Sequence, residues 1–351
     1  MIDPVQIEHF TLGEGKKPFL IAELSANHDR DLDLALRLVD IAADAGWDCV
    51  KFQTYNADSL TVPSSHPSMK IDPVWGTDNL YDLYNNAGMP MEFHAPLFER
   101  ARDRGLVPFT SIYDPRDMEF VESLGCAVYK IASFEMTFDD LLIEVAATGK
   151  PIIMSTGMAN LGEVDHAMEV LDKHNAGPVV LLHCVSSYPA PIEEVNLASM
   201  ATLRARFQRH VGFSDHTIGP DAALLASAMG AVAIEKHFTD DMTRPGPDHR
   251  FSATPEILRE IRDGVDRMQV ARGTATKDTA EAEAGNRAAF RRSAFALRDL
   301  KAGEVLTWSD YRFVRPNAGV PVSDKPALIN RKLARDVTQY DPITYDDLAP
   351  R

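Results

Sequence analysis

The 351-residue sequence has few cysteines, no excess of basic residues and no long hydrophobic run. Its three cysteines, Cys49, Cys126 and Cys184, have no paired spacing, which argues against a disulfide framework or a zinc knuckle. No apolar run is long enough to cross a bilayer, and residues 1–18 have no basic region followed by an apolar one, as a signal peptide would. These absences predict a cytoplasmic protein in a reducing compartment.

The charge balance limits the classes of partner. The chain has 52 acidic and 36 basic residues and a net charge of −16. A nucleic-acid-binding protein needs a basic face, and an anionic membrane surface attracts basic segments, so we expect neither partner. An anionic small molecule is still compatible with this charge, because a few lysines can make one cleft locally positive.

Short apolar runs alternate with helical segments through the first three quarters of the chain. Such runs are typical of parallel strands that are buried on both faces, and eight repeats predict a (β/α)8 TIM barrel over residues 1–272. The predicted strands are Phe19–Leu24, Cys49–Gln53, Val107–Ser111, Val128–Ile131, Pro151–Ser155, Val179–Cys184, Val211–Ser214 and Ala231–Lys236. The predicted helix ends are Gly46, Gly105, Gly125, Gly149 and Gly230.

Two segments interrupt this alternation. Residues 56–96 form a long insertion after the second strand, with some helix expected near residues 80–84. Residues 273–285 are polar and predict a linker to a small β-rich domain over residues 286–351.

In the first helix, Leu32, Leu36, Val39 and Ala43 lie on one predicted face.

The active site of a TIM barrel lies at the C-terminal ends of its strands. All eight predicted strands end in polar or ionisable side chains, which are unfavourable in a core unless they are paired or used. A single such residue would be interpreted as structural, but the full set indicates a functional site. The strand-end lysines Lys51, Lys130 and Lys236 suit an anion with a phosphate and a carboxylate, together with Ser111, Ser133, Ser155 and Ser214.

Histidines and carboxylates also end strands. His216 and His237 follow adjacent strands, which fits a divalent metal, a hydrogen-bonded pair or a general base. Glu23 and Glu135 are candidates for acid–base chemistry or hydroxyl binding, or they balance the lysine charge. The other histidines near strand ends, His28, His94, His183 and His249, are interpreted as structural.

Several ordered motifs resemble the sialic acid synthase family, and the resemblance covers almost the whole chain. The tail motifs KAGE at 301–304 and VRPN at 314–317 resemble the antifreeze-like (SAF) domain of that family. The barrel motifs are FLIAELSANH (19–28), VKFQTY (50–55), YKIASFE (129–135), STGM (155–158), FSDHT (213–217), EKHFT (235–239) and PGPDH (245–249).

The resemblance implies an enzyme that condenses phosphoenolpyruvate with an N-acylated amino hexose and releases phosphate. It implies Mn²⁺ or Mg²⁺ held by His216 and His237, and a domain-swapped homodimer in which Arg315 reaches the active site of a partner subunit. The implied catalytic residues are Glu23, Lys51, Glu135 and His237. The implied phosphoenolpyruvate ligands are Lys51, Ser111, Lys130, Ser133, Ser155, Ser186 and Ser214, and the implied sugar ligands are Gln53, Glu135, Tyr188, Asp248 and Arg315.

The motifs leave the sugar open. ELSANH at 23–28 and WGTDNLYDLY at 75–84 resemble pseudaminic acid synthases and favour a 2,4-diacetamido-trideoxyhexose. PGPDH resembles the neuraminic and legionaminic synthases, so N-acetylmannosamine and the legionaminic precursor are the alternatives. Ile112 stands where the family usually has a proline, which leaves the path of the following loop open.

Three other functions are the alternatives: two enzymatic ones and a non-catalytic one. A condensing barrel for a phosphorylated aldose would need a second phosphate clamp, and no spare arginine cluster ends a strand. A metal-dependent pyruvate aldolase would not need three strand-end lysines. A non-catalytic sugar-binding barrel would not need the histidine pair with those lysines.

Overall fold

The eight apolar runs form the parallel strands of a closed barrel, which confirms the predicted TIM-barrel fold. The structure is a computed structural model that describes residues 2–274 and 276–350, without the side chain of Val74. Around the barrel the strands follow the order β10, β3, β4, β5, β6, β7, β8, β9. They are β3 (Phe19–Glu23), β4 (Cys49–Thr54), β5 (Val107–Ile112), β6 (Tyr129–Ile131), β7 (Ile152–Ser155), β8 (Val179–Cys184), β9 (His210–Asp215) and β10 (Ala233–His237).

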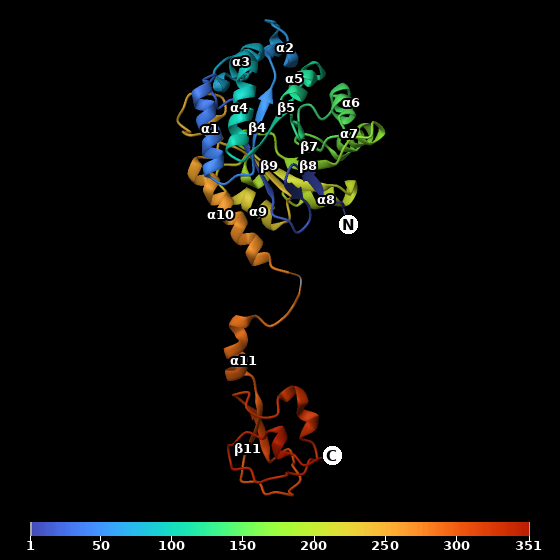
Figure 1. Cartoon of the computed structure of the whole chain (residues 1–351), viewed down its shortest axis with the longest axis vertical. Helices are drawn as coiled ribbons and strands as arrows, with labels where there is room; N and C mark the ends of the chain where they lie inside the picture. The colour runs from blue at the N-terminus through green and yellow to red at the C-terminus, as the bar shows by residue number, and fades with distance from the viewer. Residues whose placement is uncertain (1, 275, 351) are drawn as a thin grey trace. The chain divides into compact units, whose positions relative to one another are not determined.

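A helix follows each barrel strand, and the helices lie around the outside of the barrel (Figure 1). They are α1 (Leu32–Asp44), α4 (Met91–Asp103), α5 (Met118–Ser123), α6 (Asp139–Ala147), α7 (Leu161–Lys173), α8 (Ser199–Phe207), α9 (Asp221–Ala228) and α10 (Pro255–Arg272). The short 3-10 helices η3 (Pro115–Asp117), η4 (Ile192–Glu194) and η5 (His249–Phe251) lie in the loops. The five glycines predicted at helix ends all have positive φ, which confirms this use of glycine.

The buried face of α1 differs from the predicted one. Leu34, Leu38 and Val39 are fully buried, whereas Leu32 and Leu36 are only partly buried against the barrel core. The apolar stripe of this helix is wide enough that the sequence pattern fits two neighbouring faces, and packing against α4 and β4 selects one of them.

A short hairpin lies at the N-terminal end of the barrel. Strands β1 (Val5–Ile7) and β2 (Phe10–Leu12) are antiparallel, and Val5, Ile7 and Leu12 are buried in the barrel core. The ring of Phe10 lies 5.1 Å from that of Phe19, the first residue of β3. The hairpin therefore covers the end of the barrel opposite the strand ends that carry the polar side chains.

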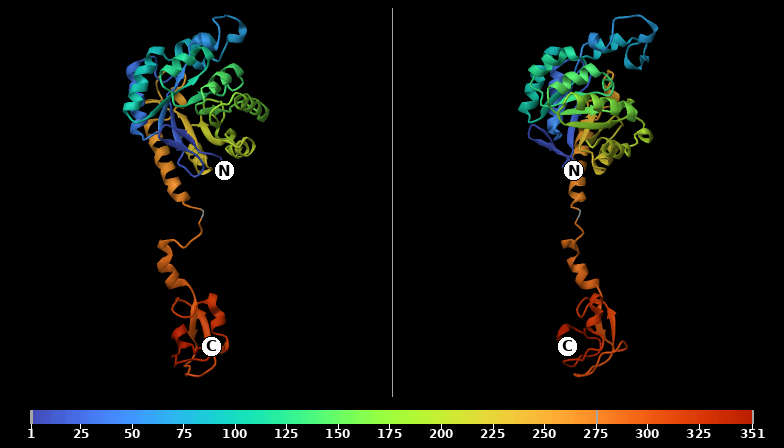
Figure 2. Two further views of the ribbon diagram at one scale, coloured as in Figure 1. Left: turned by 45° about the vertical axis from the view of Figure 1, so that its right-hand side comes forward. Right: turned by 90° about the vertical axis from the view of Figure 1, so that its right-hand side faces the viewer.

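The insertion after β4 ends earlier than predicted. It contains α2 (Ala57–Leu60), η1 (Pro67–Met69), η2 (Pro73–Trp75) and α3 (Leu80–Ala87), which confirms the helix expected near residues 80–84. Pro96, however, lies inside α4, the barrel helix that starts at Met91. Proline normally breaks a helix interior, but buried Leu97 and Phe98 anchor this helix against the barrel. In Figure 2 the insertion, light blue, projects from one end of the barrel.

The C-terminal part has its own core. The chain divides into two compact units, residues 1–273 and 274–351. In the second unit β11 (Ser293–Ala296) pairs antiparallel with β12 (Tyr311–Val314), and the two strands overlap the short β-like runs of the sequence at residues 294–297 and 311–314. Its buried residues are Ala294, Ala296, Leu300, Leu306, Tyr311, Val320, Leu328, Leu333, Val337, Ile343 and Leu348. This unit also contains η6 (Glu281–Glu283), α11 (Ala284–Phe290), η7 (Val322–Ala327) and η8 (Tyr345–Asp347), so the expected linker is partly helical.

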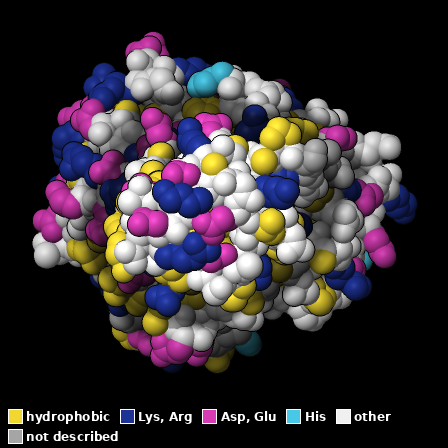
Figure 3. Space-filling view, turned by 90° about the horizontal axis from the view of Figure 1, so that it is seen from below, with side chains coloured by type: hydrophobic (Ala, Val, Ile, Leu, Met, Phe, Trp, Pro, Cys, Tyr) yellow, Lys and Arg dark blue, Asp and Glu magenta, His cyan; other side chains and the backbone are white. Residues whose placement is uncertain are grey.

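Acidic and basic side chains are interspersed over the face seen in Figure 3. The acidic residues behind the net charge of −16 therefore do not form a single acidic patch on that face. None of the helices in the described part of the chain is long and apolar enough to cross a membrane.

Candidate active site

A cavity of about 570 Å³ lies where the C-terminal ends of the barrel strands meet. Each of the eight barrel strands contributes residues to its lining, either from the strand or from the loop that follows it. The loop after β3 contributes Ser25 and Ala26. Most residues that the sequence predicted for the site face this one cavity. They are Lys51, Gln53, Lys130, Ser133, Glu135, Ser155, Ser186, Tyr188, Ser214, His216, His237 and Asp248.

Two buried lysines form the charged end of the cavity. Lys51 Nζ lies 2.8 Å from Glu23 Oε2 and donates to Ser111 Oγ at 3.0 Å. Lys130 Nζ donates to Ser155 Oγ at 2.7 Å. The Glu235 carboxylate lies between the two lysines, with Oε1 3.5 Å from Lys51 Nζ and 4.0 Å from Lys130 Nζ. Both ammonium groups are thus held by short polar contacts at the base of the site.

Burial and these ion pairs shift the titration of the cluster in opposite directions. Burial raises the pKa of Glu23 to about 7, although Lys51 opposes the shift. Burial lowers the pKa of Lys130 to about 8, with Glu235 opposing. For Lys51 the effect of burial is outweighed by Glu23 and Glu235, so its pKa is raised. The cluster therefore keeps Lys51 charged and makes Lys130 responsive to pH near neutrality.

Serine hydroxyls and one glycine form a cradle beside the lysines. Gly157, in the loop after β7, donates its N–H to Ser133 Oγ at 3.0 Å. A Cβ at this position would lie 2.2 Å from Ser186 Oγ and 2.8 Å from Ser133 Oγ. Only glycine leaves room for both hydroxyls here, so the STGM motif shapes the space between them.

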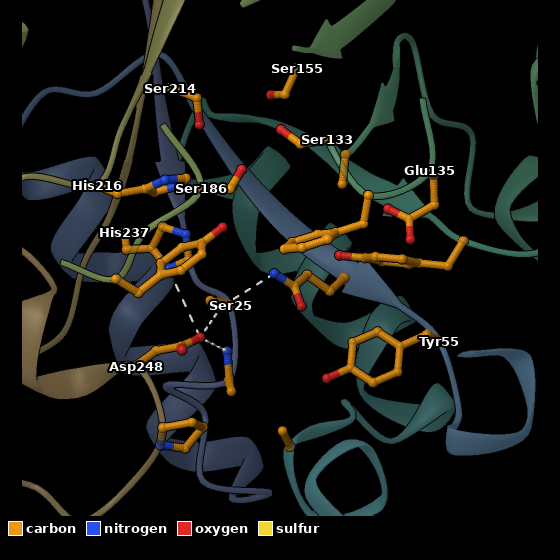
Figure 4. Close-up of a pocket in the computed structure, with 18 of the residues that line it drawn as sticks. Ser25, Tyr55, Ser133, Glu135, Ser155, Ser186, Ser214, His216, His237 and Asp248 are labelled. Atoms are coloured by element: carbon orange, nitrogen blue, oxygen red, sulfur yellow. Dashed lines mark hydrogen bonds and ion pairs between the residues drawn. The ribbon is translucent and has the colours of Figure 1, made fainter. Parts of the chain in front are cut away.

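The two imidazoles lie face to edge, with ring centres 5.3 Å apart and planes at 74° (Figure 4). His216 Nδ1 lies 2.9 Å from the Val185 carbonyl oxygen, which can only accept, so Nδ1 carries a hydrogen and Nε2 is the nitrogen with a lone pair when the ring is neutral. Burial lowers the pKa of this imidazole, but the adjacent Cys184 outweighs burial and raises it. His237 Nδ1 is buried without a hydrogen-bond partner, and burial next to His216 lowers the pKa of this imidazole well below its usual value. Both rings therefore have an unused nitrogen of the kind that binds a divalent metal.

A metal here would have few protein ligands. Within residues 2–274 and 276–350, no group of three or more His, Cys, Asp or Glu side chains is placed to hold an ion. The donor set fits a metal that His216 and His237 bind and whose other positions are taken by substrate and water.

Carboxylates and amides occupy the rest of the cavity. Burial raises the pKa of Glu135 to about 7, and its Oε2 has no hydrogen-bond partner among the described residues. On the other side Asp248 accepts a short hydrogen bond from Ser25, as Figure 4 shows. Gln53 Nε2 donates to Ser25 Oγ at 3.2 Å and to Glu23 Oε1 at 2.8 Å. These polar groups surround the space next to the histidine pair.

Three predicted site residues lie elsewhere. Glu23 and Ser111 are fully buried behind the residues that line the cavity, where they contact Lys51. Arg315 belongs to the second unit. Each of the histidines interpreted as structural has a hydrogen-bond partner, and none of them lines the cavity.

Lys236 does not belong to the anion site, which corrects the expectation of three strand-end lysines. Its Nζ lies 2.7 Å from Asp215 Oδ2 and donates to the Thr217 carbonyl at 2.8 Å. Successive residues of a strand point to opposite faces, so Glu235 and His237 face the cavity while Lys236 points away. Asp215 is its register partner on β9 and points the same way.

Sequence reasoning placed Glu235 at a strand end without giving it a role, and it did not predict the aromatic and aliphatic side chains that line part of the cavity. The alternation just described would have identified Glu235, which is two residues before His237 on β10. The aromatic and aliphatic residues had no such signal, because they come from the insertion and from loops. They are Tyr55, Leu60, Trp75, Leu83, Tyr84, Tyr113 and Phe134.

Comparison with known proteins agrees with the motifs. Residues 38–277 match the NeuB family and residues 291–349 match the SAF domain. A pseudaminic acid synthase from Helicobacter pylori is 37% identical over 94% of this chain and 98% of its own length. An N,N'-diacetyllegionaminic acid synthase from Campylobacter jejuni is 36% identical over 87% of this chain and 92% of its own length.

The fold of a solved relative agrees as well. An N-acetylneuraminic acid synthetase from Leptospira borgpetersenii, crystallised with citrate, superposes with a TM-score of 0.73 at 31% identity. The match covers 82% of this chain and 95% of the relative. On these matches the chain belongs to the NeuB family, the sialic acid synthase family that its strand-end motifs resemble.

Proposed function

We propose that this protein condenses phosphoenolpyruvate with the open-chain aldehyde of an N-acylated amino hexose and releases phosphate. One observation carries the proposal: two buried lysines, a serine cradle, two imidazoles and a carboxyl with a raised pKa line a single cavity. The named relatives are synthases of pseudaminic, legionaminic and neuraminic acids. Membership of their family supports the same reaction here.

The lysine end of the cavity would bind phosphoenolpyruvate. Lys51 and Lys130 provide two ammonium groups for its phosphate and carboxylate, and the serine hydroxyls around Gly157 donate further hydrogen bonds. Glu23 and Ser111 act through Lys51, since they contact its ammonium group and do not line the cavity. In this proposal they are positioning residues.

The opposite end would bind the sugar, with Gln53, Tyr188 and Asp248 as polar contacts. Carbon–carbon bond formation joins C3 of phosphoenolpyruvate to the aldehyde carbon and leaves an alkoxide. Glu135 can be protonated near neutral pH and can supply that proton. Water then adds at C2, which the new bond has left electron-deficient, and one of its protons returns to the Glu135 carboxylate. The second proton passes to the phosphate as the C–O bond breaks, which leaves a ketone at C2.

We propose Mn²⁺ or Mg²⁺ as the ion that His216 and His237 would hold, with oxygens of the substrate and of water as the remaining ligands. When bound, such an ion would polarise the aldehyde oxygen as a Lewis acid. The two imidazoles would hold it beside Tyr188, whose ring centre lies 4.2 Å from that of His216 and 5.9 Å from that of His237.

The proposed acceptor is a 2,4-diacetamido-trideoxyhexose, which gives a pseudaminic-type acid. Sequence identity does not separate the candidates, since the pseudaminic and legionaminic synthases match at 37% and 36%. The motifs at residues 23–28 and 75–84 favour the pseudaminic branch. N-acetylmannosamine and the legionaminic precursor are the alternatives.

Phosphate release from phosphoenolpyruvate tests the reaction. The assay contains Mn²⁺ and one candidate amino sugar at a time, with His216→Ala as the control. We expect sugar-dependent release that the variant loses. No release with any sugar of the panel would refute the synthase proposal and leave a non-catalytic sugar-binding barrel.

We further propose a cytosolic homodimer in which Arg315 completes the active site of the second copy. The three cysteines are free and buried, as expected in a reducing compartment. Mixing His216→Ala with Arg315→Ala chains tests the exchange, because a mixed dimer contains one site with both residues. Random reassociation should restore about a quarter of wild-type activity. If Arg315 serves its own chain, the mixture stays inactive.

A further inference from the structure

The insertion after β4 contributes an uncharged wall to the cavity. Tyr55, Leu60, Trp75, Leu83 and Tyr84 line the cavity, and we call these five residues the insertion wall. The lysines and serines of the cavity come instead from the barrel strands and their loops. The cavity thus has a charged inner part and a mixed aromatic and aliphatic part supplied by the insertion.

Several contacts fix the insertion wall in place. The ring of Tyr55 packs edge-on against those of Tyr84 and Tyr113, at 5.9 and 5.2 Å between centres. Arg30 Nη1 donates to the carbonyl oxygens of Asn85 and Gly88, at 3.0 and 2.9 Å, and so holds the end of α3. These contacts make the wall a preformed surface.

Trp75 connects the wall to the opposite rim of the site. The guanidinium carbon of Arg250 lies 5.2 Å from the centre of the Trp75 ring, a cation–π contact. Arg250 lies in η5, two residues after Asp248. The insertion therefore reaches the loop that carries a proposed sugar ligand.

The chemistry of the wall selects the groups that it can contact. Leu60, Leu83 and the rings offer apolar surface, which suits methyl groups. The hydroxyls of Tyr55 and Tyr84 make no hydrogen bond to another described residue, and burial raises the pKa of both, so they remain neutral partners for an amide. A sugar hydroxymethyl group against the two leucines would lose water without gaining a partner there.

We propose that the insertion wall is the specificity-determining subsite for the sugar. It takes the terminal methyl group and an acetamido group of a diacetamido-trideoxyhexose, and it disfavours sugars that end in a hydroxymethyl or phosphate group. No wall residue carries a cation that would bind a phosphate. The inference rests on the proposed function and assigns its sugar choice to these residues.

Two leucine variants test the wall independently, because Leu60 ends α2 and Leu83 lies in α3. Leu60→Asn and Leu83→Asn add an amide of similar size to the apolar surface. The measured quantity is the ratio of kcat/KM for the 2,4-diacetamido-trideoxyhexose to that for N-acetylmannosamine. We expect each substitution to lower this ratio at least about tenfold. The KM for phosphoenolpyruvate should stay at the wild-type value.

Val62→Asn is the matched control. Val62 belongs to the same insertion, is 57% exposed and does not line the cavity, so its substitution should leave the ratio unchanged. Melting temperatures and the KM for phosphoenolpyruvate show whether each variant is folded.

The outcomes separate the two proposals. If the wild-type protein converts no sugar, the proposed function fails. If it does convert the sugars but prefers N-acetylmannosamine, or if both leucine variants keep the wild-type ratio, the insertion wall is refuted and the synthase activity stands.

Discussion

Replacing Gly157 by alanine tests whether the serine cradle binds phosphoenolpyruvate. The added methyl carbon would lie 2.2 Å from Ser186 Oγ and 2.8 Å from Ser133 Oγ, both far inside van der Waals contact. One or both hydroxyls must turn away, or the loop after β7 must move. Either adjustment removes hydroxyl donors from the cavity.

Turning a serine hydroxyl away costs little in itself, but it removes the hydrogen bonds that the two hydroxyls would donate to the bound substrate, which costs about 1 to 3 kcal/mol. This cost falls on the bound state, so the Kd for phosphoenolpyruvate rises roughly 5- to 150-fold. Isothermal titration calorimetry with phosphoenolpyruvate alone measures this, without sugar or turnover. The thermal unfolding of the variant, recorded alongside, shows that the barrel is intact.

Gly162→Ala is the control, since Gly162 lies in the first turn of α7, five residues further on. A Cβ there would contact Asn160 Oδ1 at 3.2 Å. Gly162 does not line the cavity. Its Kd should match that of the wild type. A wild-type Kd for Gly157→Ala as well would show that the cradle does not bind the substrate.

Three further predictions concern charge and metal. Glu135→Gln should raise the free energy of unfolding at pH 8 by up to about 3 kcal/mol and have little effect at pH 4. The reason is that burial raises the pKa of this carboxyl to about 7, so it destabilises the fold only when it is ionised. Urea unfolding at both pH values measures the effect, and a loss of stability at pH 8 would contradict it. Lys51→Met should lower the free energy of unfolding at pH 7 by about 3 kcal/mol, since it leaves two buried carboxylates without their shared ammonium group; wild-type stability would show that this ion pair is dispensable. His237→Ala should abolish calorimetric binding of Mn²⁺ in the presence of phosphoenolpyruvate, whereas His166→Ala, on the surface beside Asp139, should not; binding retained in His237→Ala would place the metal elsewhere.

The barrel could be predicted because its strands are buried on both faces and so appear as apolar runs. The same topology brings their C-terminal ends to one rim, which is why strand-end residues as distant in sequence as Lys51 and His237 could be assigned to one site before their contacts were known. In the second unit the short β-like runs at residues 294–297 and 311–314 likewise indicated β11 and β12.

The tertiary structure alone decided how those residues are used. Lys236 was assigned to the anion site from its position at a strand end, but the pleat directs it to Asp215. Helix α4 continues through Pro96 because long-range packing outweighs the local propensity of proline.

The insertion shows the limit of the sequence most clearly. Its length predicted a functional loop, but no periodicity shows where an irregular segment folds. Contacts with residues distant in sequence, Arg30 with the end of α3 and Arg250 with Trp75, bring it over the cavity. The sequence by itself therefore determined the barrel and the chemical groups at its rim, because local patterns encode them. The shape of the cavity and the pairing of its charges depend on contacts between distant residues, which only the tertiary structure decided.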